Sequence, residues 1–283
     1  MQPDPRALTF ACEGDWLHGV LDLPAPSDPA PARGVLIVVG GPQYRAGSHR
    51  QFTLLARALA AGGVPAMRFD YRGMGDSEGA PRSFDNIDAD VRAAVDAFFA
   101  AAPGLQEVVL WGLCDGASAA MLYAASDARV SGLVLLNPWA RSEQGLAKAT
   151  LKHYYAARLF DPGLWKKIVS GRFDVRGALA SLAKLLGSAR ARPGANAGPR
   201  SKSLPDQLHD GVTRFNGRVL LVTSGADLTA QEFLTVTAAP QWQAWLQRST
   251  LTHQRLAGAD HTCSRHAWRE QVTQWTAAWL ASW

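Results

Sequence analysis

The feature that most constrains the fold of this chain is a short apolar strand that runs directly into a glycine-containing turn. Residues 108–111 read Val-Val-Leu-Trp, and Gly112, Cys114 and Gly116 follow before a helix-like stretch of small residues. When a strand turns abruptly into a helix, the positions on either side of the tip come into contact, and side chains there would collide. The pattern therefore predicts a sharp strand-to-helix turn with Cys114 at its tip.

Strand-like and helix-like segments alternate along most of the chain. Residues 34–39 form a short continuous apolar run, which is typical of a strand buried on both faces of a sheet. The other expected strands are an N-terminal hairpin at 8–11 and 16–23, and segments at 64–69, 107–111, 130–136, 218–223 and 250–256. The expected helices are 49–61, 84–101, 114–125, a helical region up to 247, and a last helix up to 283. This alternation predicts an α/β fold with a doubly wound, mostly parallel sheet and helices on both faces.

One long basic segment interrupts this pattern. Between Arg141 and Arg218 the chain has 15 Lys or Arg against 5 Asp or Glu, a local charge of +10, whereas the whole chain carries +5. We therefore expect a core formed by residues 1–138 and 216–283, with a basic helical cap or lid inserted at residues 139–215.

The turn around Cys114 resembles the nucleophile elbow of α/β-hydrolases, with cysteine in place of serine. Such a turn lifts its central residue above the carboxyl edge of the sheet, where the N-terminus of the following helix favours negative charge. The simpler interpretation is a buried structural thiol, but the flanking glycines favour a nucleophile. Two serines compete with it. Ser77 lies in a literal Gly-x-Ser-x-Gly between Gly75 and Gly79, but turn residues separate it from the preceding strand, and Ser118 falls inside the expected helix.

A thiol nucleophile needs a base, and the base needs an acid that orients it. In α/β-hydrolases the order along the chain is nucleophile, acid, base. Asp227 and His261 each come just past the end of an expected strand, so we expect both at the sheet edge that carries Cys114. Their simpler interpretations are a helix N-cap and a surface turn. Asp260 is the rival acid, although a sequence neighbour rarely reaches the correct side of an imidazole.

A second glycine-containing turn should supply a hydrogen-bond donor to the oxyanion of an acyl-transfer intermediate. The main-chain N–H of Asp115 is the expected first donor, and either Gly41 or Gln43 is the expected second. Arg45 and His49 follow, and both are candidates to hold an anionic group of a substrate. Their simpler interpretation is solvated surface charge.

Over nearly its whole length the chain resembles an α/β-hydrolase, and three segments resemble a narrower family. Residues 40–52, 112–118 and 258–262 are similar to the exosortase A system-associated hydrolases, whose genes lie beside exopolysaccharide and protein-sorting genes in Gram-negative bacteria. The resemblance implies that the cysteine, aspartate and histidine named above form a catalytic triad. One departure from common hydrolases is a Gly-Gly-Pro turn where His-Gly is usual.

These features predict a thiol-dependent hydrolase that cleaves an ester or thioester through an acyl-cysteine intermediate. An acyltransferase that passes the acyl group to a sugar or another hydroxyl is the first alternative, and an inactive binding or scaffold protein is the second. The basic cap favours an anionic small-molecule acyl substrate, held partly by Lys148 and Lys152, or a peripheral contact with acidic membrane lipids. Nucleic-acid binding is not expected, because no recognition motif accompanies the positive charge.

The composition argues against several classes of site and of protein. The three cysteines are odd in number and lack Cys-x-x-Cys spacing, which argues against a disulfide framework or a structural zinc site. The sequence has no ligand cluster or dinucleotide-binding loop, so neither a metal nor an organic cofactor is expected. It also has no apolar run of about 18 residues and no signal-peptide order at the N-terminus. We therefore expect a cytoplasmic protein, and the sequence leaves its oligomeric state open.

Overall fold

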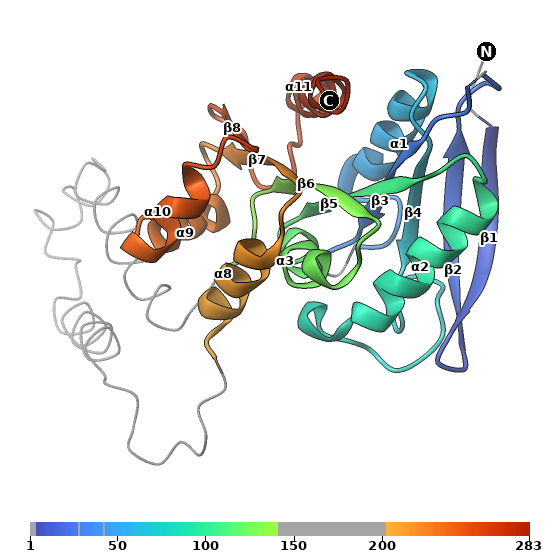
Figure 1. Cartoon of the computed structure of the whole chain (residues 1–283), viewed down its shortest axis with the longest axis horizontal. Helices are drawn as coiled ribbons and strands as arrows, with labels where there is room; N and C mark the ends of the chain where they lie inside the picture. Colours follow the sequence, from blue (N-terminus) through green and yellow to red (C-terminus); the bar gives the residue numbers. More distant parts are fainter. Residues whose placement is uncertain (1–3, 28, 42, 141–201) are drawn as a thin grey trace, which may run out of the picture.

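A central sheet organises the molecule in the computed structural model, which describes residues 4–27, 29–41, 43–140 and 202–283. The sheet has eight strands in the order β1-β2-β4-β3-β5-β6-β7-β8 (Figure 1). The pairs β1–β2 and β2–β4 are antiparallel, and all later neighbours are parallel. The strands are β1 (Asp4–Cys12), β2 (Asp15–Leu23), β3 (Arg33–Val38), β4 (Ala66–Asp70), β5 (Glu107–Leu113), β6 (Val130–Leu136), β7 (Arg218–Ser224) and β8 (Leu251–Leu256).

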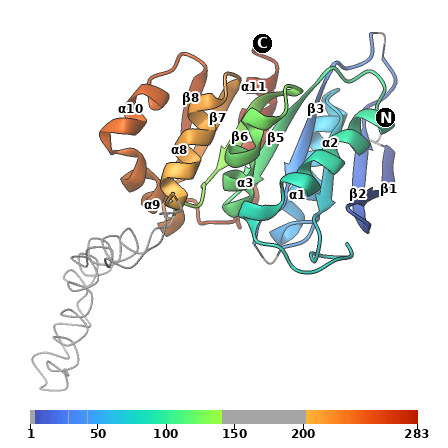
Figure 2. The same cartoon turned by 60° about the horizontal axis from the view of Figure 1, so that its bottom comes forward.

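Helices cover both faces of this sheet (Figure 2). One face carries α1 (Gln51–Ala61) and α11 (His266–Leu280). The other face carries α2 (Asp88–Ala101), α3 (Asp115–Tyr123), α8 (Leu204–Arg214), α9 (Leu228–Thr237) and α10 (Pro240–Leu246). Short 3-10 turns are η1 (Ser48–Arg50), η2 (Phe84–Asn86) and η3 (Ala124–Ser126).

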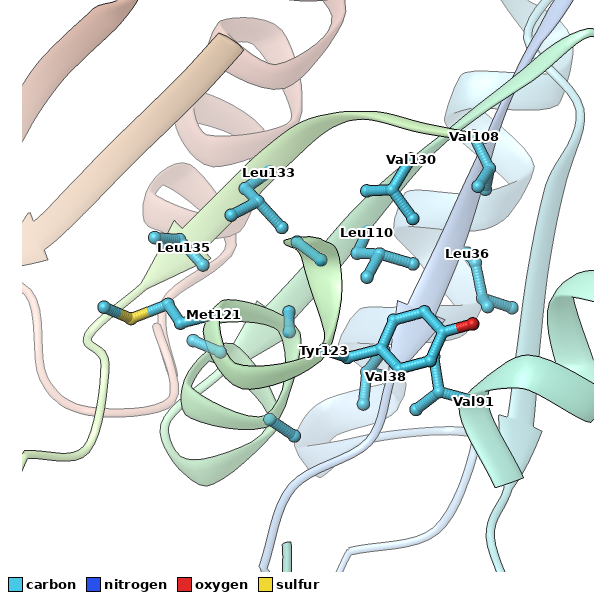
Figure 3. Close-up of a cluster of buried hydrophobic side chains, with 14 of the residues drawn as sticks. Leu36, Val38, Val91, Val108, Leu110, Met121, Tyr123, Val130, Leu133 and Leu135 are labelled. Atoms are coloured by element: carbon cyan, nitrogen blue, oxygen red, sulfur yellow. The ribbon is translucent and has the colours of Figure 1, made fainter. Parts of the chain in front are cut away.

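Alternate side chains of the central strands enter two separate hydrophobic cores, because successive residues of a strand point to opposite faces. Leu36, Val38 and Leu110 belong to the core beneath α2 and α3 (Figure 3). Ile37 and Trp111 belong to the core beneath α1 and α11. The sheet is therefore buried on both faces, as the continuous apolar run in β3 predicts.

The boundaries of several helices differ from the sequence expectation. His49 and Arg50 have left-handed backbone angles, with φ of 54° and 58°, so α1 begins at Gln51 and not at 49. A left-handed residue cannot continue a right-handed helix, and apolar spacing does not reveal it. The helical region expected up to 247 is split into α9 and α10, because Ala239 is extended before Pro240.

Helix α8 falls within residues 139–215, the range expected to form the cap, and it packs against α3. A Cβ atom at Gly211 would lie 2.3 Å from the carbonyl oxygen of Met121, so the absence of a side chain permits the two helices to approach closely. Residues 141–201 of the same range lie outside the described part of the chain. The cap and its boundaries therefore stay a prediction.

The parallel strands β3, β5, β6, β7 and β8 all end at one edge of the sheet, and the loops that follow them meet there. This edge is where ligands bind in open α/β sheets. Among the described residues, no helix is both long enough and apolar enough to span a bilayer.

Candidate active site

Cys114 occupies the tip of the turn between β5 and α3, with φ of 59° and ψ of −124°. The flanking glycines are required sterically. A Cβ atom at Gly112 would lie 2.4 Å from the main-chain nitrogen of Ala117, and one at Gly116 would lie 2.4 Å from the carbonyl oxygen of Val38. A positive φ at a non-glycine residue stores strain that the surrounding structure must support, and such strain concentrates at functional sites.

His261 and Asp227 meet beside this turn, although they follow different strands. The Nδ1 atom of His261 lies 2.9 Å from Oδ2 of Asp227, whose side chain is 5% exposed. Asp227 is also the N-cap of α9, because its carboxylate accepts the main-chain N–H groups of Thr229 and Ala230 at 3.1 and 3.2 Å. Asp227 therefore has both roles that the sequence allowed, as a helix N-cap and as the partner of the imidazole. Because it caps α9, its carboxylate is held in place against the imidazole.

The electrostatics of the site favour a charged imidazole. The hydrogen bond with Asp227, and after it the hydrogen bond with Cys114, raises the pKa of His261 to about 10, although burial opposes the shift. These bonds favour the charged form of His261, with one ring nitrogen facing the carboxylate and the other available to the thiol. The structure brings Cys114, His261 and Asp227 together as the strand ends predict.

The rival acid faces elsewhere. The carboxylate of Asp260 accepts the main-chain N–H of Ser264 at 2.9 Å and also the Ser264 hydroxyl. It therefore closes its own loop, whereas Asp227 contacts the imidazole.

The side chain of Asp115 has a role at this edge that the sequence did not reveal. Its carboxylate accepts the main-chain N–H of Gly116 at 3.1 Å and is also hydrogen-bonded by the main-chain N–H groups of Gly41 and of Asp115 itself. Burial raises the pKa of this carboxyl, and these hydrogen bonds oppose the shift. A Cβ atom at Gly40 would lie 2.2 Å from Oδ1 of Asp115, so the Gly-Gly turn leaves room for the carboxylate.

Two of the expected oxyanion donors are already hydrogen-bonded within the protein. The N–H groups of Asp115 and Gly41 already have an internal acceptor, and the side chain of Gln43 accepts the main-chain N–H of Ser48 at 3.3 Å. In the sequence, this contact is accompanied only by an acidic residue directly after Cys114 and by the Gly40-Gly41 pair.

A comparison against protein families agrees with the fold. A model described as the alpha/beta hydrolase family matches residues 17–276, which is most of the chain. The chain belongs to the alpha/beta hydrolase family. The matched range includes the strand-to-helix turn and the loops that carry Asp227 and His261.

Solved structures share the hydrolase fold at low sequence identity. The esterase Pf2001 from Pyrococcus furiosus has a TM-score of 0.66 and 14% identity, with 99% of this chain and 91% of that chain covered. Est1E from Butyrivibrio proteoclasticus has a TM-score of 0.58 and 17% identity, with 98% and 99% covered. XC6422 from Xanthomonas campestris, an α/β serine hydrolase without a lid, has a TM-score of 0.56 and 20% identity, with 98% and 95% covered. No curated protein matches the hydrolase in sequence.

The basic residues expected to bind substrate differ in their surroundings. Arg45 of the hydrolase pairs with the buried carboxylate of Asp70 and, at 2.6 Å, with Asp76. Its main-chain N–H also donates to Asp70 at 2.6 Å. An anionic substrate group would therefore share this guanidinium with two carboxylates. His49 lies close enough to Asp260 to interact with its charge.

The two lysines assigned to substrate binding, Lys148 and Lys152, lie outside the described residues. Their role stays a prediction.

Both competing serines have structural hydrogen bonds. The hydroxyl of Ser77 donates to the carbonyl of Asp70 at 2.6 Å and accepts the main-chain N–H of His18 at 2.9 Å, so it joins β4 to β2. The hydroxyl of Ser118 is buried and donates to the carbonyl of Trp139 at 2.6 Å. Cys114 is thus the nucleophile candidate that faces a base.

The other cysteines of the hydrolase are buried. Burial raises the pKa of Cys12, and burial raises the pKa of Cys263 to about 11. The described residues contain no group of His, Cys, Asp and Glu side chains suited to hold a metal ion.

Proposed function

We propose that this hydrolase is a thiol-dependent esterase or thioesterase in which Cys114 is the nucleophile, His261 the acid–base and Asp227 the orienting carboxylate. The observation that carries the proposal is the arrangement of a strained cysteine at the tip of the elbow, hydrogen-bonded to an imidazole that is itself bound to a buried carboxylate. Three residues so connected are the usual signature of an activated nucleophile.

The chemistry follows from the charge state of the imidazole. The Cys114 thiolate attacks the carbonyl carbon, so a carbon–sulfur bond forms and the carbonyl π electrons move to oxygen. When the tetrahedral intermediate collapses, the leaving alkoxide or thiolate takes the proton of the His261 imidazolium. Neutral His261 then accepts a proton from water as the water attacks the acyl-thioester. The second collapse releases the acid and restores the thiolate and the imidazolium.

Asp227 keeps the imidazole in the correct orientation throughout, and its own position is fixed by α9. The oxyanion is assigned to main-chain donors near Asp115, Gly41 and Gln43. Because the Asp115 carboxylate already engages two of these N–H groups, we infer that it shifts or takes up a proton when the oxyanion forms.

The finer features of the proposal come from the sequence. We propose that the enzyme is of the exosortase-associated type and acts on an anionic acyl substrate, with Arg45, His49, Lys148 and Lys152 near its charged portion. We also propose a cytoplasmic location, which fits the three free cysteines. There the basic segment would contact acidic lipids. Passage of the acyl group to a hydroxyl acceptor instead of water would use the same intermediate.

Mass spectrometry of the covalent intermediate tests the mechanism. The protein is incubated with panels of acyl-thioesters and acyl-esters, and we expect an acyl adduct on the peptide that contains Cys114. Cys114→Ala should lose the adduct and turnover, whereas the matched control Ser77→Ala should keep both. An adduct or full turnover in Cys114→Ala would show that another residue is the nucleophile. Added sugar acceptor should leave the rate of acid release unchanged in a hydrolase and should divert the product in an acyltransferase.

Variants of the acid and base separate their roles. His261→Ala should lower kcat by about 1000-fold, which lies within the usual range for general acid–base groups. Asp227→Asn should lower it less, because the thiolate and imidazolium can pair without full support from the carboxylate. Asp260→Asn is the control for a neighbouring carboxylate and should have the smallest effect. If Asp260→Asn lowers kcat more than Asp227→Asn does, the assignment of Asp227 as the acid is wrong.

A further inference from the structure

The residue directly after β6, Asn137, is fully buried and lies between the loops that carry the proposed catalytic groups. Its backbone is left-handed, with φ of 48°. Asn and Asp adopt this conformation more readily than other residues with side chains. A buried amide in such a conformation needs partners, because an unsatisfied polar group in the interior is unfavourable.

Asn137 finds these partners on two neighbouring segments. Its Oδ1 accepts the main-chain N–H of Ser224 at 2.8 Å, and its Nδ2 donates to the Ser224 hydroxyl at 2.9 Å and to the carbonyl of His261 at 3.2 Å. The orientation of the amide is fixed chemically, since a main-chain N–H can only donate and a carbonyl can only accept. Its main-chain N–H donates to Val222 at 3.0 Å.

The same strand end also supports the nucleophile. The carbonyl of Leu136, the last residue of β6, accepts the main-chain N–H of Cys114 at 2.9 Å. Two consecutive residues at the end of β6 therefore bind the main chain of the nucleophile and the main chain of the base. Cys114 and His261 are thus both hydrogen-bonded to the end of β6.

The loop that carries His261 needs such support, because it follows the edge strand β8, in which every residue except Leu256 is partly or fully exposed. Gly225 and Ala226, which follow β7, donate their main-chain N–H groups to the carbonyls of Leu256, at the end of β8, and of Ala259, in the loop, each at 2.9 Å. The Asn137 amide, by contrast, hydrogen-bonds to His261 itself.

We propose that Asn137 is a positioning residue for the reaction, which holds the main chain of His261 at the height where its ring meets both Asp227 and Cys114. The proposal rests on the proposed function for its catalytic consequence. A misplacement of about 1 Å in such a group can lower a rate by about 100-fold without touching the substrate.

Three variants separate this role from a merely structural one. Asn137→Gly removes the amide and keeps a backbone that tolerates positive φ. Asn137→Asp keeps the shape and the acceptor for the Ser224 N–H but has no N–H to donate to the His261 carbonyl. Ser224→Ala is the matched control, because it removes the other partner of Nδ2 and leaves the bond to His261 in place.

We expect kcat to fall by about 100-fold in Asn137→Gly and Asn137→Asp, with KM changed by less than about twofold. Ser224→Ala should stay within about threefold of the wild-type kcat. Thermal unfolding is measured for all three, so that each kcat is compared at a temperature where the variant is folded. Wild-type kcat in Asn137→Gly would overturn the proposal.

A second measurement needs no substrate. The NMR resonance of the His261 Nδ1 proton, identified by its loss in His261→Ala, reports the hydrogen bond with Asp227. We expect it to shift or broaden in both Asn137 variants and to stay unchanged in Ser224→Ala. An unchanged resonance in Asn137→Gly would also overturn the proposal. If the wild-type protein forms no acyl adduct, the proposed function fails while this resonance still decides the role of Asn137.

Discussion

At the scale of single residues, the three cysteines of this hydrolase differ in what surrounds them. Cys114 is half-buried and hydrogen-bonded to an imidazole, whereas Cys12 and Cys263 are buried. Because the thiolate is the reacting form of cysteine, a thiol with a raised pKa and no access to solvent reacts slowly. The chain therefore contains its own controls for the reactivity of the proposed nucleophile.

Alkylation should distinguish these thiols. We expect iodoacetamide at about pH 7 to label Cys114 at least about 100-fold faster than Cys12 or Cys263 in the folded protein. Peptide mapping by mass spectrometry after timed quenching measures the three rates. Unfolding in urea is the control, since it should bring them together. Equal rates in the folded protein would mean that the elbow and His261 do not activate the thiol.

Because the pKa of His261 is raised, we expect the free energy of unfolding to depend on pH. The pKa is raised from the ordinary 6.5 to about 10 by the bonds with Asp227 and Cys114. A group with a raised folded-state pKa contributes stability that is complete below its unfolded value and is lost as the pH rises through the folded value. The free energy of unfolding should therefore fall between about pH 7 and pH 10 by more in the wild type than in Asp227→Asn.

Urea unfolding of both proteins across this range measures the difference, and Asn still caps α9 in the variant. Parallel curves for the two proteins would show that Asp227 does not raise the pKa of the imidazole.

At the scale of elements, the sequence predicts the sheet better than the helix starts. Continuous apolar runs identified the buried strands, because burial on both faces requires them. The apolar pattern places the start of α1 too early, since the left-handed angles of His49 and Arg50 depend on the preceding turn and not on side-chain polarity. The same division holds for the site. Cys114, Asp227 and His261 follow strand ends that can be read in the sequence, whereas the contacts of Asp115 and Asn137 join segments that only the folded chain brings together.

The elbow gives a prediction at this scale. Gly116→Ala would place a methyl group 2.4 Å from the carbonyl of Val38, at the contact between α3 and β3. We expect a loss of about 1–3 kcal/mol in the free energy of unfolding, as in other overpacked sites, together with reduced turnover. Gly62→Ala is the matched control, because its nearest neighbouring atom would lie at an ordinary 3.4 Å. Similar stability of the two variants, measured in urea, would contradict the steric account of the elbow.

At the scale of the whole molecule, charge is divided unequally. The segment between Arg141 and Arg218 carries a local charge of +10 in a chain of net charge +5, so the remainder is acidic. Clustered positive charge raises the local concentration of anionic ligands, and salt weakens this effect. Inside the described core, by contrast, Arg45 is already paired with Asp70 and Asp76. We therefore propose that selectivity for an anionic substrate comes from the basic segment.

Salt dependence tests this assignment. Two esters with the same acyl group, one anionic and one neutral, are compared at low and high ionic strength. We expect a higher kcat/KM for the anionic ester, a smaller preference at high salt, and a smaller preference again when Lys148 and Lys152 are both replaced by alanine. Equal kcat/KM values that do not respond to salt would leave the basic segment without a role in substrate choice.

The close packing around Gly112 and Gly116 has a consequence for the evolution of such enzymes. The close contacts at Gly112 and Gly116 involve only Cβ positions and main-chain atoms, so they are indifferent to whether the tip holds sulfur or oxygen. Cysteine and serine codons differ by a single base. A lineage can therefore exchange one nucleophile for the other in one mutational step without passing through an unfolded intermediate.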